Sequence, residues 1–293
     1  MIKADNAIIL AAGYSSRFVP LCFDVPKGLL IVKGETLIER QIRQLKEIGI
    51  NKIYIITGAY AKQFEFLKTK HNIKLIFNPD YSSKNNFASI YVARDVLVNS
   101  IISSSDLYFT KNVFQNQAEH SYYLSIYING KTRQRSLELD QNDKIIKTNY
   151  GGENCWITFG GQAFFTKELS KKLLSYIEPV YNNPQYANKY WVDFQDEHLN
   201  ELPMYIKKAN TKDIIEFNTL GALRSFDSTF SAIGISKTMK FLCNKLNAKE
   251  EELTDFEPIK IGNNAIGCTF AYNNHCYKYL HDEKSIREIK INE

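Results

Sequence analysis

The chain has 293 residues, of which 44% are hydrophobic and 24% are charged, enough for the core of one or two domains. Its formal charge of +5 comes without any block of five like charges, which argues against a nucleic-acid-binding surface. No run approaches about 18 apolar residues, and the 5 cysteines are widely spaced without a C-x-x-C pair. These features argue against membrane insertion, a disulfide framework and a zinc site, and they predict a cytoplasmic globular protein.

The first half of the chain alternates apolar strands with helices. Residues 7–13 and 52–58 are continuous apolar runs typical of buried strands, and residues 36–50 carry apolar residues at helical spacing and end near Gly49. The alternation continues through helical segments at 61–72 and 88–98 and strand-like segments at 74–78 and 100–109. Helices that alternate with apolar strands predict an α/β fold whose parallel sheet is covered on both faces.

The pattern changes from residue 121 onward. Strand-like runs at 122–130, 135–150 and 155–166 follow one another, and Gln-Asn-Asp forms a turn signal inside the second run. This pattern predicts an antiparallel insertion. A helical segment at 167–180 and apolar strand-like segments at 204–209 and 213–218 follow.

The stretch AAGYSSRF at residues 11–18 follows the first strand and is rich in small residues. Gly13 lets the backbone pass close to a ligand, two serines supply hydroxyl and amide donors, and Arg17 supplies a fork of donors suited to phosphate. Lys27 follows a stiffening proline and adds a compact positive charge. Residues 10–27, here called the anion loop, are therefore predicted to bind an anion; the alternative is a structural turn with a surface arginine.

The pattern LAAGYSSRF…PKGLL resembles the signature loop of nucleotidyltransferases that join a nucleoside triphosphate to a phosphorylated small molecule. Segments 56–60, 78–97, 103–109 and 190–208 extend the likeness, which is greatest to the bacterial choline-phosphate cytidylyltransferases. The resemblance implies an α/β fold with a mixed, mainly parallel Rossmann-like sheet of the nucleotidyltransferase type, with a small α+β appendage at the C-terminus.

The resemblance also implies roles for individual residues. In such enzymes the residues that match Arg17 and Lys27 neutralise the triphosphate, and the aspartate that matches Asp106 binds Mg²⁺, the expected cofactor. The residues implied in nucleotide binding are Leu10, Ala11, Ala12, Gly13, Tyr14, Ser15, Ser16, Asn85, Asn86 and Ser89. For the last three, which would read the base, the alternative is an ordinary helix N-terminus.

A trimethylammonium group offers no donor hydrogen, so aromatic faces and a nearby carboxylate suit it best. The candidate acceptor-binding residues are Trp156, Tyr190, Trp191 and Asp193. The alternative is that the two tryptophans, the only two in the chain, pack the core. Other phosphorylated amines, phosphonates or amides stay open as acceptors, because Asp193 and Glu197 would suit a primary ammonium equally well.

Two departures from the family pattern stand out. The closing family stretch E-x-D-[ST] has Asn218 where an aspartate would be the second magnesium ligand. An amide oxygen can coordinate Mg²⁺ but brings no charge, so the affinity for the metal should fall unless Glu216 or Asp193 compensates. Residues 237–293 resemble only the beginning of a choline-kinase-like domain. We therefore expect a nucleotidyltransferase domain at 1–227 and, at 228–293, a remnant without kinase activity that packs on the first domain or mediates assembly.

The sequence thus predicts an enzyme that transfers CMP from CTP to phosphocholine or a similar phosphorylated amine and releases pyrophosphate. The alternatives are a sugar-1-phosphate or aminophosphonate nucleotidyltransferase, and a non-catalytic nucleotide-binding regulatory protein. Intact Arg17, Lys27 and Asp106 argue against the last. Small molecules, and neither nucleic acid nor a membrane, are the expected partners, and the formation of a homo-oligomer stays open.

Overall fold

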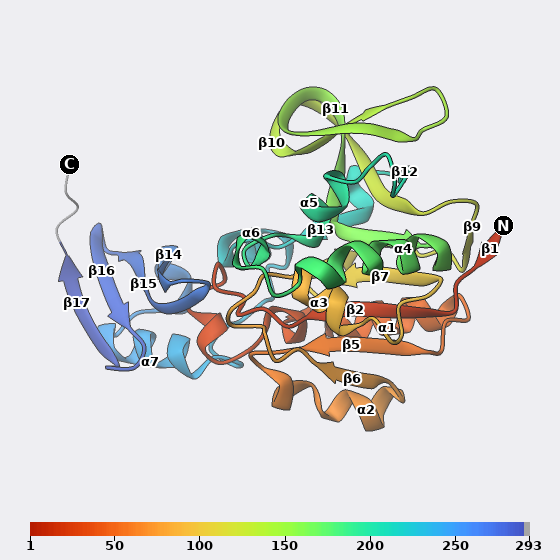
Figure 1. Ribbon diagram of the computed structural model, residues 1–293. Helices are drawn as coiled ribbons and strands as arrows, with labels where there is room; N and C mark the ends of the chain where they lie inside the picture. The colour runs from red at the N-terminus through yellow and green to blue at the C-terminus, as the bar shows by residue number, and fades with distance from the viewer. Residues whose placement is uncertain (290–293) are drawn as a thin grey trace. The chain divides into compact units, whose positions relative to one another are not determined.

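The computed structural model describes residues 1–289, and the chain divides into two compact units (Figure 1). The first unit comprises Met1–Gly13 and Glu39–Glu216. The second comprises Tyr14–Ile38 and the chain from Phe217 onward. The predicted domain boundary at residue 227 falls inside the second unit, at the end of a helix, and residues 290–293 lie outside the described residues.

A seven-stranded mixed sheet forms the centre of the first unit. In spatial order its strands are β12 (Tyr205–Ala209), β10 (Tyr122–Leu139), β11 (Ile145–Phe165), β7 (Ser100–Ser104), β2 (Asn6–Ala11), β5 (Ile53–Thr57) and β6 (Lys74–Phe77). The pairs β7–β2, β2–β5, β5–β6 and β10–β12 are parallel, whereas β11 runs antiparallel to both of its neighbours. The predicted mixed, mainly parallel sheet is confirmed.

All six residues of β2 are buried, as expected for a central strand whose two faces are both covered. The helices that accompany the sheet are α1 (Leu37–Glu47), α2 (Phe66–His71), α3 (Phe87–Val92), α4 (Lys167–Ile177) and α5 (Trp191–Asp196). They are shorter than the sequence predicted. Segment 61–72 divides into a 3₁₀ turn (Ala61–Phe64) and α2, and α4 gives way to a 3₁₀ turn at Glu178–Val180, whose proline has no N–H for a helical hydrogen bond.

The antiparallel insertion is present as the hairpin of β10 and β11, which Figure 1 shows in yellow-green. Its turn lies where the sequence placed it: the Asp140 side chain accepts hydrogen bonds from the amides of Asn142 and Lys144. The sequence predicted several short strands, but the structure has two long strands with repeated register shifts. Gly151 and Gly152, with φ of +86° and +153°, let β11 bend within one element.

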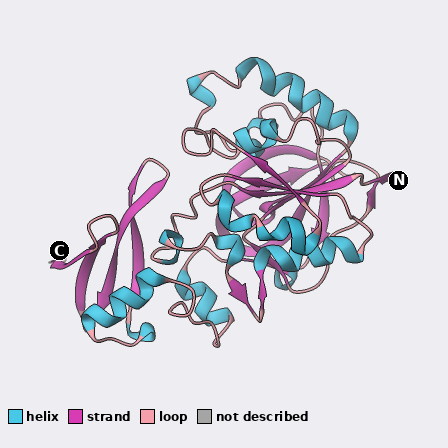
Figure 2. Ribbon diagram, turned by 90° about the horizontal axis from the view of Figure 1, so that it is seen from below, coloured by secondary structure: helices cyan, strands magenta, loops and turns pink. Residues whose placement is uncertain are grey.

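The second unit contains three groups of elements. A short hairpin, β3 (Ile31–Val32) and β4 (Glu35–Thr36), follows two 3₁₀ turns, η1 (Leu21–Phe23) and η2 (Lys27–Leu29). Two helices come next, α6 (Leu220–Phe226) and α7 (Lys237–Leu246). An antiparallel sheet of four strands closes the chain, shown in Figure 2: β14 (Thr254–Ile261), β15 (Asn264–Tyr272), β16 (His275–Leu280) and β17 (Ser285–Ile289). The small α+β appendage is confirmed.

Within the described part of the chain, no helix has the length and apolar character needed to cross a membrane.

Candidate active site

The anion loop begins at the carboxyl end of β2, in the middle of the sheet. Leu10, Ala11 and Ala12 are buried there, and the Ala12 carbonyl accepts a hydrogen bond of 3.1 Å from the Ala59 amide. Gly58 fits this approach because a Cβ on it would lie 2.4 Å from the Ala12 oxygen. A Cβ at Gly13, in contrast, would meet no described atom within 4 Å, so crowding inside the protein does not explain this glycine.

Asp106 lies in the turn that connects β7 to β8 (Leu107–Phe109). Leu10 pairs with Ser104 in the parallel ladder of β2 and β7, and the Ser105 amide donates a 3.0 Å hydrogen bond to the Leu10 carbonyl. The first unit therefore brings together the start of the anion loop and Asp106, as expected for residues that follow neighbouring parallel strands.

A side chain that the sequence reading missed fixes this turn. Gln41 on α1 is fully buried, and its Nε2 donates to the carbonyls of Ser104 and Leu107 at 2.8 and 2.9 Å. Its Oε1 accepts from Ser103 Oγ at 2.7 Å. Both ends of the Asp106 turn are thus held by one amide. A signal existed in the sequence, because position 41 belongs to the buried, otherwise largely apolar face of the helix.

Glu216 and Asn218, besides Asp106, carry oxygen atoms of the kind that Mg²⁺ prefers. β13 (Ile214–Glu216) pairs with β8 so that Glu216 is opposite Leu107, the residue after Asp106. Two residues farther along, in the second unit, Asn218 Oδ1 is buried and finds no hydrogen-bond partner among the described residues. No group of three or more acidic, His or Cys side chains within residues 1–289 is arranged to hold a metal ion. Mg²⁺ is often bound through one or two carboxylates and substrate phosphates.

The rest of the anion loop belongs to the second unit and is held by hydrogen bonds between its own residues. The Lys27 amide donates to Ser15 Oγ at 3.2 Å, and the Ser15 carbonyl accepts from the Phe18 amide at 2.8 Å. Ser15 has a φ of +55°. Lys27 is only 6% exposed, with its ammonium 5.6 Å from the centre of the Phe18 ring, whereas Arg17 is exposed. Tyr14 and Ser16 are half-buried.

The asparagines predicted to read the base are engaged with another segment. Asn86 is the N-cap residue of α3, but its Oδ1 accepts from the Trp191 amide at 2.9 Å. Asn85 donates from Nδ2 to the Asn188 carbonyl at 3.1 Å. Ser89 is 2% exposed, and its hydroxyl accepts from Asn78 at 3.3 Å. The position of Asn86 at the start of α3 matches the alternative of an ordinary helix N-terminus. Reading of the base by these three residues stays a prediction.

The candidate acceptor residues differ strongly in exposure. Trp191 is 2% exposed and packs against Tyr123 and Phe165, with ring centroids 5.6 and 5.4 Å away. In this structure it is therefore a core side chain, and its predicted contact with an acceptor stays a prediction. Tyr190 is half exposed. Trp156 on β11 is half-buried.

Asp193 is also half-buried, and it accepts a 2.7 Å hydrogen bond from the hydroxyl of Tyr150, which lies on the β10–β11 hairpin. Partial burial of that hydroxyl and the hydrogen bond to Asp193 raise the pKa of Tyr150 to about 12. The phenol therefore stays neutral near pH 7. Together the two side chains offer a carboxylate beside an aromatic ring, a combination that suits a cation.

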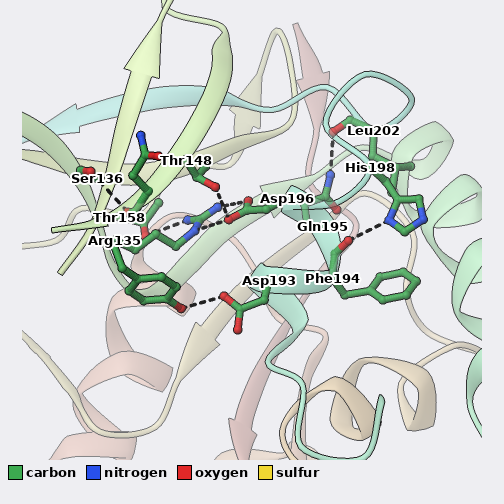
Figure 3. A network of polar contacts seen from close by, with 12 residues as sticks. Arg135, Ser136, Thr148, Thr158, Asp193, Phe194, Gln195, Asp196, His198 and Leu202 are labelled. Atoms are coloured by element: carbon green, nitrogen blue, oxygen red, sulfur yellow. Dashed lines mark hydrogen bonds and ion pairs between the residues drawn. The ribbon is translucent and has the colours of Figure 1, made fainter. Parts of the chain in front are cut away.

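A buried ion pair lies one helical turn from Asp193 (Figure 3). Arg135 is 6% exposed and forms two hydrogen bonds with the carboxylate of Asp196, which also accepts from Thr148 Oγ1 at 2.8 Å. Arg135 donates in addition to Thr158 Oγ1 at 2.9 Å. Burial raises the pKa of Asp196, against the opposing effect of Arg135. The pair joins α5 to the β10–β11 hairpin, and the sequence reading did not find it.

Comparisons with known proteins agree with this arrangement. Residues 7–125 match the MobA-like NTP transferase domain family. The chain is 34% identical over 225 residues to the choline-phosphate cytidylyltransferase of Streptococcus pneumoniae, covering 76% of this chain and 96% of that protein. It is 30% identical over 229 residues to the 2-aminoethylphosphonate cytidylyltransferase of Lancefieldella rimae, covering 77% and 93%.

A solved structure of the CTP:phosphocholine cytidylyltransferase from Streptococcus pneumoniae is also similar. It superposes with a TM-score of 0.73 at 33% identity, over 78% of this chain and 100% of that one. The chain therefore belongs to the family of nucleotidyltransferases that includes the bacterial choline-phosphate cytidylyltransferases.

Proposed function

We propose that this enzyme transfers CMP from CTP to phosphocholine or a closely related phosphorylated amine and releases pyrophosphate. The observation that carries the proposal is the likeness to choline-phosphate cytidylyltransferases over nearly their whole length. The pairing of Asp193 with Tyr150 supports a cationic acceptor. A cytoplasmic location and small-molecule partners are part of the same proposal, and the oligomeric state stays open.

Anion binding is the role proposed for the loop at residues 10–27. Backbone amides and serine hydroxyls are suited to the triphosphate oxygens, and Arg17 is suited to the departing pyrophosphate. Lys27 is nearly buried, so water screens its charge little and its attraction to a phosphate is strong. We propose that Lys27 holds the reacting phosphates.

The acceptor needs no general base from the protein. The second pKa of a phosphomonoester is about 6, so near neutral pH the acceptor phosphate is mostly a dianion and can attack the α-phosphorus directly. The chain's own residues then position two anions and neutralise their charge. We therefore assign the role of general base to none of the described side chains.

Asp106, with Glu216 and the amide oxygen of Asn218, is proposed to hold Mg²⁺. When bound, the ion supplies positive charge to the phosphate oxygens. The buried Asn218 oxygen supports this assignment because a buried acceptor without a hydrogen bond is costly unless a ligand satisfies it. Neutral Asn218 brings less attraction than an aspartate would.

For the acceptor we propose a site around Asp193, Tyr190 and Trp156, with Trp191 at the start of α5 packed into the core beside them. A primary ammonium could donate hydrogen bonds to Asp193, so an aminophosphonate acceptor is the second candidate. The relative named for 2-aminoethylphosphonate favours it. We also propose that residues 228–293 derive from the beginning of a choline-kinase-like domain and have no kinase activity.

Pyrophosphate release tests the proposal. The four nucleoside triphosphates are each combined with phosphocholine, phosphoethanolamine, 2-aminoethylphosphonate and glucose 1-phosphate. CTP with phosphocholine should react fastest, and Lys27→Ala should lower that rate by about 100-fold or more, while Lys52→Ala, at an exposed lysine, should not. Fastest release with the sugar phosphate or the phosphonate would replace the proposed acceptor, and no release with any pair would favour a non-catalytic protein.

A further inference from the structure

The C-terminal segment contacts the anion loop through aromatic rings inside the second unit. The 3₁₀ turn η1 packs on α7. In η1, the Phe23 ring stacks on His281, with centroids 4.3 Å apart and planes 9° apart. Phe23 also meets Tyr279 of β16 edge-on at 6.0 Å. The Phe23 side chain is therefore held in place by residues of the C-terminal segment, Tyr279 in β16 and His281 just after it.

A carboxylate of the loop also ends at α7. Asp24 Oδ2 accepts from Ser236 Oγ at 2.7 Å and from the Thr238 amide at 2.8 Å. Ser236 is the N-cap residue of α7, and its Oγ in turn accepts from the Met239 amide. A negative charge at a helix N-terminus is favourable because the free amides there carry partial positive charge. The first turn of α7 therefore depends on a residue of the loop, and the loop on the helix.

A third contact lies on the other side of Lys27 in the chain. The Lys33 amide donates a 2.7 Å hydrogen bond to Asp227 Oδ2, and the Lys33 ammonium lies 3.7 Å from Oδ1. Asp227 is 2% exposed and also accepts from the amide and hydroxyl of Thr229. The tight turn of β3 and β4 is thus attached to the end of α6.

We infer that residues 227–289 are a positioning element for the anion loop. Their contacts at Phe23, Asp24 and Lys33 bracket Lys27 in the chain and restrict the path of the backbone that presents it. The kinase-like remnant would then serve the nucleotidyltransferase by ordering its triphosphate loop. The catalytic part of this inference rests on the proposed function, whereas the ordering of the loop does not.

Amide hydrogen exchange over residues 14–30 of the full chain tests the ordering without any substrate. His281→Ala removes the ring that stacks on Phe23, and exchange of the loop should become faster. His275→Ala is the matched control, because His275 lies in the same sheet but is exposed and paired with Glu288. Asp24→Ala should also accelerate exchange, and Asp24→Asn, which keeps an acceptor oxygen, should accelerate it less.

Steady-state kinetics test the catalytic part. His281→Ala should raise KM for CTP about two- to tenfold, with KM for phosphocholine unchanged, and His275→Ala should change neither. Unchanged loop exchange in both His281→Ala and Asp24→Ala, or equal acceleration in His275→Ala, would overturn the inference. Faster exchange with an unchanged KM for CTP would overturn its catalytic part, even where pyrophosphate release by the wild type upholds the proposed function.

Discussion

Asp193 and Trp191 stand two positions apart on α5 and have opposite environments. Trp191 is enclosed by core rings, so Trp191→Ala would lose about 3–5 kcal/mol of unfolding free energy and would report on packing before it reported on substrate. Asp193 is half-buried, and it is bound by the hydroxyl of the largely exposed Tyr150. Asp193 is therefore the residue at which acceptor recognition can be tested cleanly.

Asp193→Asn should raise KM for phosphocholine about tenfold or more, since an interaction with a charged group is worth roughly 1.5–3 kcal/mol. KM for CTP should stay nearly unchanged, because the carboxylate is proposed to meet only the acceptor's cationic head. Steady-state kinetics with each substrate varied at saturating levels of the other would measure both constants.

Glu201→Gln is the control, because Glu201 is exposed in the turn region that follows the same helix and has no proposed role in binding. It should leave both constants near the wild-type values. Normal phosphocholine kinetics in Asp193→Asn would remove Asp193 from the acceptor site.

At the scale of elements, α1 does more than cover the sheet. Gln41 and Gln44 both lie on its buried face, and Gln44 donates to the Phe109 carbonyl at 3.2 Å. Gln41 reaches the two carbonyls on either side of Asp106, as Ser104 and Leu107 flank that turn. One helix thus supports β8 with one amide and the proposed metal-binding turn with the other.

Gln41→Leu should lower kcat and raise the Mg²⁺ concentration needed for half-maximal rate, because two carbonyls would lose their donor and the turn would lose its fixed position. Gln44→Leu is the control with a similar change in burial. Both variants should lose roughly 1–3 kcal/mol of unfolding free energy, but only Gln41→Leu should shift the Mg²⁺ requirement. An equal shift in both would show that the helix acts only through stability.

The sequence predicted the types of the main elements better than their lengths. Strands such as β2 and β5 are easily recognised, because burial on both faces of the sheet makes them continuous apolar runs without alternating polar residues. The long bulged strands β10 and β11 could not be foreseen, because their register shifts depend on pairing with each other and not on local propensity. The end of α4 before Pro179 could have been read from the sequence.

At the scale of the whole molecule, the chain leaves the first unit at Gly13 and returns at Glu39. The residues between them, including Arg17 and Lys27, belong to the same compact unit as the C-terminal segment. Motif spacing showed which residues of the loop carry charge. It could not show that Asp24 would bind Thr238 or that Lys33 would bind Asp227, each pair some two hundred residues apart in the chain. Such contacts exist only in the folded chain.

The stability of the second unit should depend on pH through the ionisation of Asp227. Hydrogen bonds from the Lys33 amide and from Thr229 hold the pKa of Asp227 below its ordinary value of about 3.9. Its contribution to stability is therefore complete above that value and is lost as pH falls through the lower pKa of the folded protein.

Thermal unfolding followed between pH 6 and pH 2.5 should show this loss. The wild type should unfold at a higher temperature than Asp227→Asn near pH 6, and the difference should shrink below about pH 4. Asp255→Asn, at an exposed aspartate of β14, is the control and should follow the wild type across the range. A difference that stays constant down to pH 2.5 would contradict the role of the ionised carboxylate.

The hydrogen bond between Asn86 and the Trp191 amide connects a proposed nucleotide-binding residue with the helix of the proposed acceptor site. If the base is read through Asn86 as proposed, a cytosine that drew on the Oδ1 lone pair already used by the Trp191 amide would compete with the first turn of α5, the helix that carries Asp193. Occupancy of the proposed nucleotide site and of the proposed acceptor site would then be thermodynamically linked. Linkage is reciprocal, so whatever factor CTP imposes on the affinity for the acceptor, the acceptor must impose on the affinity for CTP.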